Sequence, residues 1–234
     1  QDRNLYVDWI RVEGPLDAAT RTNPARQRIL VCTPSATMTE AQCAREIFSR
    51  FGRHAWRRPL TASELTDLVA FLDVARAQGE GFEAGVALGL QAMLVSPHFV
   101  FRVELDPMPT ATQAHPLNAH ELAARLSYFL WSSTPDATLE MLADQGQLND
   151  PAVLRAQVTR MLADPKARAL TENFAGQWLY TRGVADHDVN ATLFPQLTDA
   201  VRDSFRAEAD AYFDEFLRGD LSMRDFLTAD FTFV

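Results

Sequence analysis

Hydrophobic positions recur with the 3.6-residue spacing of α-helices along most of the chain. One apolar face opens the series, formed by Ala44, Ile47, Phe48 and Phe51. A second face follows Thr61 and ends at Gly79, and a third segment, 82–96, is apolar nearly all round and stops at Pro97. Within that third segment, Gly85 and Gly89 would allow a neighbouring helix to approach closely. The first half of the chain therefore predicts three helices.

The second half shows the same periodicity, with recognisable start signals. Capping-box pairs are Thr39 with Gln42, Thr61 with Glu64, and Asn118 with Glu121. Pro135 and Pro151 stand where the first residue of a helix is expected. We expect helices over 118–131, from Pro135, from Pro151 through Leu162, and over about 166–181 and 197–217.

One segment has the pattern of a strand. Residues 5–12 are β-branched and aromatic and are followed by Gly14 and Pro15. A lone strand cannot satisfy its backbone hydrogen bonds, so we expect it to complete a β-rich module that precedes residue 1. The predicted fold is mainly α, with two consecutive helical bundles preceded by one strand left from an upstream β domain. The expected divisions are 1–16 for that module, 17–105 and 117–234 for the helical domains, and the proline-rich segment 106–116 for a linker.

The net charge and the distribution of charged residues indicate which kinds of partner the protein is expected to lack. The net charge is −9, whereas a protein that binds nucleic acid through phosphate contacts presents a basic face. One basic cluster exists and comprises Arg50, Arg53, His54, Arg57 and Arg58. We interpret it as a solvated helix end with ion pairs to nearby acids. No apolar window reaches the roughly 20 residues that span a bilayer, so neither nucleic acid nor a membrane span is predicted for this segment.

Two cysteines, Cys32 and Cys43, are separated by ten residues. A structural zinc site needs four ligands, and neither a C-x-x-C pair nor the C-x-x-C-H haem motif is present in the sequence. The spacing leaves two alternatives open, namely two unrelated buried thiols or a disulfide. A disulfide would stabilise the fold by about 3 kcal/mol and would place it in an oxidising compartment.

Two places in the sequence could hold a cofactor. His98 follows a helix stop, and a neutral imidazole there could ligate haem iron that another domain presents. The alternative is a histidine hydrogen-bonded to backbone at a helix end. Asp186, Asp188 and Asn190 copy the first, third and fifth ligands of a calcium loop, but Ala191 and Leu197 replace the glycine and glutamate that the loop requires. A polar loop that caps the next helix is the alternative to calcium.

Catalytic motifs are absent from the sequence: there is no Gly-rich phosphate loop, G-x-S-x-G elbow or H-E-x-x-H. The helix over 197–217 carries Asp199, Asp203, Glu208, Asp210, Asp214 and Glu215. Paired carboxylates could do acid–base work, but arginines interleave with them as on a solvated face. Five aromatic residues could form a stacking platform or a path for electron transfer, although aromatic residues at helical spacing are typical of a core: Tyr128, Phe129, Trp131, Trp178 and Tyr180. Whether the protein is an enzyme stays open.

Several longer motifs carry a family resemblance. In the first half they are Arg28-Ile-Leu-Val-Cys-Thr-Pro34, Cys43-Ala-Arg-Glu-Ile47, Arg57-Arg-Pro-Leu60 and Leu94-Val-Ser-Pro-His-Phe-Val-Phe-Arg102. In the second half they are Glu121-Leu-Ala-Ala-Arg-Leu-Ser-Tyr-Phe-Leu-Trp-Ser-Ser133, Glu172-Asn-Phe-Ala-Gly-Gln-Trp-Leu179 and Ala229-Asp-Phe-Thr-Phe-Val234. The two halves resemble planctomycete secreted domains five and four, which occur in cytochrome c-like multidomain proteins. The resemblance covers about residues 26–234.

The resemblance implies export, to the periplasm or the cell surface, and a disulfide between Cys32 and Cys43. It also implies a β-rich module before the helical domains and a haem-bearing domain after them, with the second helical domain continuing past residue 234. We therefore expect haem c in flanking domains and no cofactor held by this segment alone, apart from the calcium considered above.

Three functions follow as hypotheses. The leading one is a helical scaffold and interaction segment of an exported, c-type-haem-associated protein, whose partners are flanking domains and other proteins in a larger complex. The second is part of a secreted hydrolase or polysaccharide-processing enzyme that uses the carboxylates of 199–215. The third is a helical subunit or adaptor of a larger assembly, which would expose a sizeable apolar patch.

Overall fold

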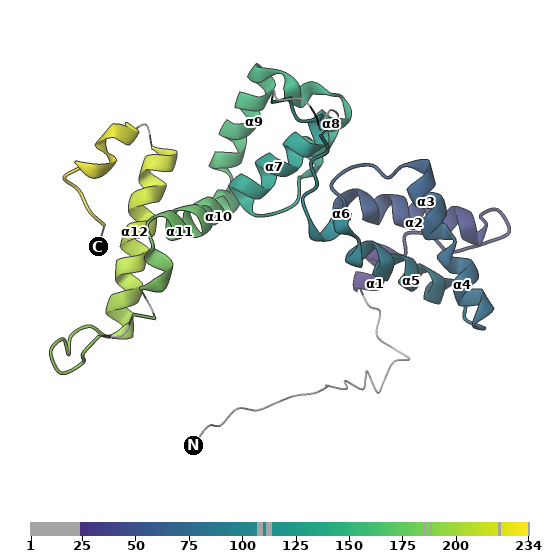
Figure 1. Ribbon diagram of the computed structural model, residues 1–234, viewed down its shortest axis with the longest axis horizontal. Helices are drawn as coiled ribbons and strands as arrows, with labels where there is room; N and C mark the ends of the chain where they lie inside the picture. Colours follow the sequence, from purple (N-terminus) through teal and green to yellow (C-terminus); the bar gives the residue numbers. More distant parts are fainter. Residues whose placement is uncertain are drawn as a thin grey trace. The chain divides into compact units, whose positions relative to one another are not determined.

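The described residues of a computed structural model are 24–106, 110, 114–184, 186–187, 189–219 and 221–233. Over these ranges the chain forms helices, turns and one isolated antiparallel bridge between Ser35 and Met38, which confirms the mainly α fold (Figure 1). The predicted strand at 5–12 lies outside the described residues, as does part of the predicted linker. No helix in these ranges is long and apolar enough to cross a membrane.

The chain separates into two compact units. The described part of the first unit comprises 24–51 and 63–89, and the second unit comprises 52–62 and the described residues from Leu90 onward. The divide falls within two helices, α2 (Glu40–Ala55) and α5 (Phe82–Val95). The domain boundaries proposed from the sequence stay a prediction.

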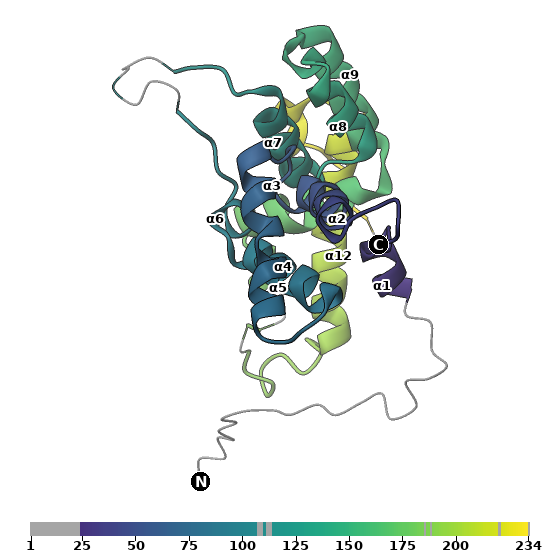
Figure 2. The same cartoon turned by 90° about the vertical axis from the view of Figure 1, so that its right-hand side faces the viewer.

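In the first unit, glycines bring helices into close contact. A Cβ at Gly89 would lie 2.4 Å from the Phe48 ring, and one at Gly85 would lie 2.8 Å from Cα of Leu72. The close approach expected at Gly85 and Gly89 is therefore present, and α5 runs beside α4 (Phe71–Ala77) in both views (Figures 1 and 2). Buried Ile47 and Phe48 complete this core.

Local signals set most ends of the first unit's elements. Thr39 and Gln42 form the expected capping box, with hydrogen bonds of 2.8 and 3.2 Å, at the start of α2. The helix expected over 61–79 is divided at Ala70 into α3 (Ala62–Val69) and α4. Gly79, with φ of +78°, ends α4, and the N–H of Glu80 donates to the carbonyl of Ala75.

The disulfide implied by the family resemblance is present. The Sγ atoms of Cys32 and Cys43 lie 2.05 Å apart and join the segment after α1 (Pro24–Ile29) to the first turns of α2. Cys43 is fully buried. The bridge therefore ties a segment with little regular structure to the core of the first unit.

The second unit is built around α7 (Ala119–Trp131), α8 (Ala137–Asp144) and α9 (Pro151–Ala163). Its core combines buried side chains of these helices with those of the segment that follows: Ala123, Leu130, Trp131, Leu139, Leu142, Ala143, Leu148, Met161, Ala167 and Leu170. The buried indole N–H of Trp131 donates to the carbonyl of Met161 at 2.9 Å, which satisfies its one polar group.

Helix starts in this unit follow the expected caps, with one correction. Asn118 and Glu121 form the capping box of α7, and Asp150 caps α9 just before Pro151. The helix expected from Pro135 begins at Ala137, because Asp136 is the N-cap and accepts a hydrogen bond from the N–H of Leu139 at 2.9 Å. Asp136 also pairs with Arg160 at 2.8 Å, a tertiary contact that fixes the cap in place.

The helix expected over 166–181 is irregular. It consists of η2 (Pro165–Ala167), α10 (Arg168–Leu170), the π-helical η3 (Thr171–Ala175) and α11 (Gly176–Trp178). The long helix expected over 197–217 is α12 (Asp199–Arg218), capped by Thr198. Short helices complete the series: η1 (Gln147–Asn149), η4 (Thr181–Gly183), η5 (Met223–Leu227) and α6 (Pro97–Val100).

Candidate functional site

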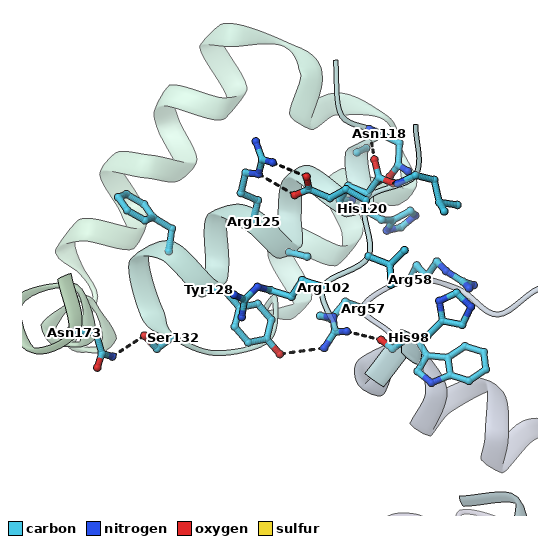
Figure 3. A pocket seen from close by; sticks show the side chains of 18 of the residues that line it. Arg57, Arg58, His98, Arg102, Asn118, His120, Arg125, Tyr128, Ser132 and Asn173 are labelled. Carbon is cyan, nitrogen blue, oxygen red and sulfur yellow. Dashed lines mark hydrogen bonds and ion pairs between the residues drawn. The ribbon is translucent and has the colours of Figure 1, made fainter. Parts of the chain in front are cut away.

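A cavity of about 830 Å³ lies in the second unit (Figure 3). Four stretches line it: the turn after α2, the segment from α6 to Leu105, one face of α7, and residues of the segment from η3 to η4. These stretches are far apart in the sequence and are brought together by the fold. We take this cavity as the candidate functional site because it is large enough to enclose a small ligand.

Arg57 organises one wall of the cavity. It follows α2 with φ of +58°, a left-handed conformation that is unfavourable for a residue other than glycine. Its guanidinium donates to the carbonyls of His98, Phe99 and Phe101, the last at 2.7 Å. A further bond of 3.3 Å reaches the hydroxyl of Tyr128 (Figure 3). Arg57 thus holds the end of α6 and the extended chain after it against α7.

His98 lies at the start of α6, half-buried in the cavity wall. Its ring packs on Trp56 with centroids 5.0 Å apart, and the indole N–H of Trp56 donates to the carbonyl of Met93 at 3.2 Å. Pro97, expected to end a helix, also begins the next one, because Ser96 caps α6. Whether His98 ligates haem stays a prediction.

The guanidinium groups of two arginines lie near the ring of Tyr128. The Arg102 guanidinium carbon lies 4.9 Å from the ring centroid, and that of Arg57 lies 5.6 Å from it (Figure 3). Such cation–π contacts stabilise by about 0.5–1 kcal/mol each when exposed. Among the described residues, Arg102 forms this contact but no hydrogen bond or ion pair.

Both carboxylates in the lining already have partners. Glu104 pairs with Arg125 through two hydrogen bonds, one of 2.9 Å (Figure 3). Glu121 accepts from the N–H groups of Asn118 at 3.0 Å and Leu105 at 2.9 Å. The same glutamate therefore caps α7 and fixes the extended chain, and neither acid forms an ion pair with Arg57 or Arg102.

The cavity is thus cationic in a protein of net charge −9. Its arginines are Arg57, Arg58, Arg102, Arg125 and Arg182, against the two glutamates described above. Arg182 donates to the backbone carbonyl of Asn173 at 2.8 Å and to its side-chain oxygen at 3.0 Å, and these partners carry no charge. The arrangement suits an anionic group better than a metal cation.

The basic cluster expected from the sequence is only partly a set of ion pairs. Arg53 pairs with Glu140 at 3.0 Å and with Asp144 at 2.6 Å, and His54 lies 2.9 Å from Glu140. Burial lowers the pKa of nearby His120, and the charge of Arg53 adds to this effect despite the carboxylate of Asp144. The interpretation is wrong for Arg57, whose partners are backbone carbonyls and a tyrosine hydroxyl.

The proposed calcium loop is described only in part. Asp188 lies outside the described residues, and Asp186 is exposed. The side-chain oxygen of Asn190 accepts from the N–H groups of Thr192 at 3.0 Å and Leu193 at 3.3 Å, so it stabilises a turn. Among the residues with described positions, no group of three or more His, Cys, Asp or Glu could hold a metal ion. Calcium binding by this loop remains a prediction.

The acidic residues of α12 do not line this cavity. Asp214 pairs with Arg218 at 2.8 Å and accepts from the hydroxyl of Thr171 at 3.1 Å. Burial raises the pKa of Asp210, an effect that the charge of Arg206 only partly offsets. The hydrolase hypothesis stays a prediction, and it would be contradicted if amide substitutions at Glu208, Asp210 and Asp214 left a measured activity unchanged.

The five aromatic residues considered in the sequence lie in three different environments. Tyr128 and Phe129 line the cavity, whereas Trp131 is buried in the core. Trp178 and Tyr180 are exposed, and Trp178 stacks on Phe174 with centroids 5.8 Å apart. One sequence signal could have indicated the cavity: four of the motifs behind the family resemblance, 57–60, 94–102, 121–133 and 172–179, each supply lining residues.

Comparison with known families agrees with the expected resemblance. The PSD4 family model, described as "Protein of unknown function (DUF1592)", matches residues 117–234. The PSD5 model, described as "Protein of unknown function (DUF1595)", matches residues 43–104. No curated protein and no solved structure matches the chain. Because the first match spans half of the 234 residues, the chain belongs to the PSD4 family and carries a PSD5-like region before it.

Proposed function

We propose that this chain is a helical scaffold and interaction segment of an exported multidomain protein, in which it holds neighbouring domains of the same polypeptide. One observation carries the proposal. Four apolar side chains at the end of α5 and around α6 are exposed: Val95 at 75%, Phe99 at 40%, Val100 at 60% and Phe101 at 63%. We call these residues the α6 apolar surface. They stand within residues 95–101, and contiguous exposed apolar patches mark interaction sites.

The α6 apolar surface is held in place from behind. Arg57 binds the carbonyls of Phe99 and Phe101, so the backbone that carries two of the exposed rings is fixed before any partner arrives. A preorganised surface loses less conformational entropy on binding than a loose segment does. None of its four residues lines the cavity, which separates this surface from the cationic site.

The occupant to which we commit is another domain of the same polypeptide. The family resemblance implies a β-rich module and a haem-bearing domain beside the helical segment. A domain tethered by a short linker is present at an effective concentration of order millimolar, so even a modest apolar contact is occupied. A subunit of a separate protein is the competing occupant.

Export is supported by the disulfide. Such bonds persist in the periplasm and outside the cell, and are rare among cytosolic proteins. A link to haem c rests on the family resemblance, with His98 as the candidate contact because its ring lines the cavity. An absorption spectrum of the full-length protein tests the link to haem c, since a c-type haem gives a characteristic signature. Its absence would contradict the haem association, and a spectrum unchanged by His98→Ala would contradict ligation by His98.

Hydrogen–deuterium exchange on the full-length protein tests the scaffold role. A Phe101→Ser/Val100→Ser variant is compared with a matched control, Leu193→Ser, at another exposed apolar position. We expect the first variant to increase exchange in a neighbouring domain, because its contact is lost, and the control to leave exchange there unchanged. Equal exchange in the wild type and in both variants would contradict the proposal. Increased exchange only in a separate protein bound to this one would favour the adaptor hypothesis instead.

A further inference from the structure

The cationic charge of the cavity is not neutralised within it. Arg57 and Arg182 bind uncharged oxygens, and Arg102 has no hydrogen-bond or ion-pair partner among the described residues. Clustered like charges repel one another, and several of one sign in a single cleft raise the local concentration of an oppositely charged ligand. An anion that enters this site would remove the repulsion as well as gain hydrogen bonds.

The placement of Arg102 suits an oxyanion. Its guanidinium lies over the Tyr128 ring, 4.9 Å from the centroid, so its apolar face is occupied. The N–H donors lie along the edges of the guanidinium plane, where they match two oxygens of a carboxylate or phosphate. Arg57 lies near the same ring and adds a second positive charge. Figure 3 shows both side chains beside Tyr128 in the cavity wall.

The cavity is larger than an oxyanion alone requires. At about 830 Å³ it falls within the range of about 300–1,000 Å³ that small-molecule sites occupy. Phe129 and Phe174 contribute rings to the lining, with centroids 6.2 Å apart, and both are exposed. Asn173 and Gln177 add amide groups to the same lining. Aromatic side chains with a few polar groups are the usual lining of small-molecule sites, and aromatic rings pack favourably against other rings.

We propose that this cavity binds a small ligand in which an oxyanion, a carboxylate or a phosphate, is attached to a ring-containing body. Arg102, with Arg57 beside it, binds the oxyanion, and the rings of Phe129 and Phe174 contact the body. Arg57 serves both sites, because it also holds the backbone of the α6 apolar surface. The inference is tested at Arg102, which has no part in the scaffold role, so the two proposals can fail separately.

Isothermal titration calorimetry on the full-length protein tests the proposal with four probes. They are 2-naphthyl phosphate, 2-naphthoate, neutral 2-naphthol and inorganic phosphate. We expect at least one ring-bearing anion to bind about tenfold or more tightly than naphthol and inorganic phosphate, and its affinity to fall as sodium chloride is raised. The tighter of the two ring-bearing anions identifies the preferred oxyanion.

Variants locate the binding. Arg102→Gln should weaken binding of that probe by about 10- to 100-fold, the range for a lost hydrogen bond to a charged group. Arg102→Lys, which keeps the charge but not the planar fork, should weaken it less. Arg155→Gln removes an exposed arginine of α9 outside the cavity and should change nothing. Thermal unfolding of each variant verifies that it is folded.

Three results would overturn the proposal. They are no binding by either ring-bearing anion, equal binding of naphthol and the anions, and equal affinities of Arg102→Gln and Arg155→Gln. Inorganic phosphate that binds as tightly as naphthyl phosphate would overturn the requirement for a ring.

Discussion

The disulfide makes a quantitative prediction about stability. Cys32 and Cys43 are 11 positions apart, so the bond closes a loop of about 12 residues in the unfolded chain. In the chain-entropy model such a loop lowers the entropy of the unfolded state by about 9.5 cal/mol/K, which is about 2.8 kcal/mol at 298 K. We expect the Cys32→Ala/Cys43→Ala variant to lose about that much free energy of unfolding. Alanine is the suitable replacement because Cys43 is fully buried, where a serine hydroxyl would need a partner.

Urea unfolding of the full-length protein, followed by circular dichroism, measures this loss. The matched control is chemical: a reducing agent should destabilise the wild type by the same amount and leave the double-alanine variant unchanged. A loss below about 1 kcal/mol, or a variant that the reducing agent weakens as much as the wild type, would refute the reasoning. The first outcome would mean that the loop is already restricted in the unfolded state.

Three further predictions concern single side chains, each measured by urea unfolding. Arg57→Ala should lower the free energy of unfolding by about 2–3 kcal/mol, because the hydrogen bonds to carbonyls are lost. Arg57→Gly should lower it by about 1 kcal/mol less, because glycine adopts the φ of +58° without strain. Equal losses for the two variants would contradict a strained backbone at this position. For Asp136, burial raises the pKa, but the bonds from Arg160 and from the N–H of Leu139, with nearby positive charge, outweigh it and hold the pKa below its usual value. Asp136→Ala should therefore cost about 1–2 kcal/mol at pH 7, and the difference should shrink as pH falls below about 3.9 toward the lowered folded-state pKa. A difference that stays constant or grows as pH falls would contradict this. Burial raises the pKa of Asp210, so its charged form disfavours folding. Asp210→Asn should stabilise by up to about 1 kcal/mol at pH 7 and have no effect below about pH 3, whereas destabilisation at pH 7 would show that the charge is favourable.

Helix ends with a complete local signal could be predicted from the sequence. The capping boxes at Thr39 and Asn118 and the glycine stop at Gly79 need only residues within a few positions of each other. The start at Pro135 was wrong because a proline fits several positions near a helix start. Asp136 is fixed as the cap by Arg160, 24 residues away, and no local pattern contains that contact.

The cavity could not be predicted from periodicity. In the sequence, Arg57 is one of several charged residues at a helix end, and Arg102 is a polar residue after an apolar run. Both arginines belong to the cavity because their guanidinium groups contact Tyr128, which lies 71 positions from Arg57. The π-helical segment η3 likewise makes a contact that no local pattern contains, the hydrogen bond from buried Thr171 to Asp214, 43 positions away. Local sequence indicates helix ends where the capping signal is complete, whereas side chains from distant segments make the site.

Cross-linking tests most directly whether another domain covers the α6 apolar surface. A photoreactive phenylalanine analogue is placed at Val100 of the full-length protein, with the same analogue at Leu193 as the control position. Peptide mass spectrometry then identifies the products after irradiation. We predict cross-links from position 100 to one defined patch of another domain within the same polypeptide, and none to that patch from position 193. Products at position 100 that involve only solvent, or only a separate protein, would contradict the proposed role.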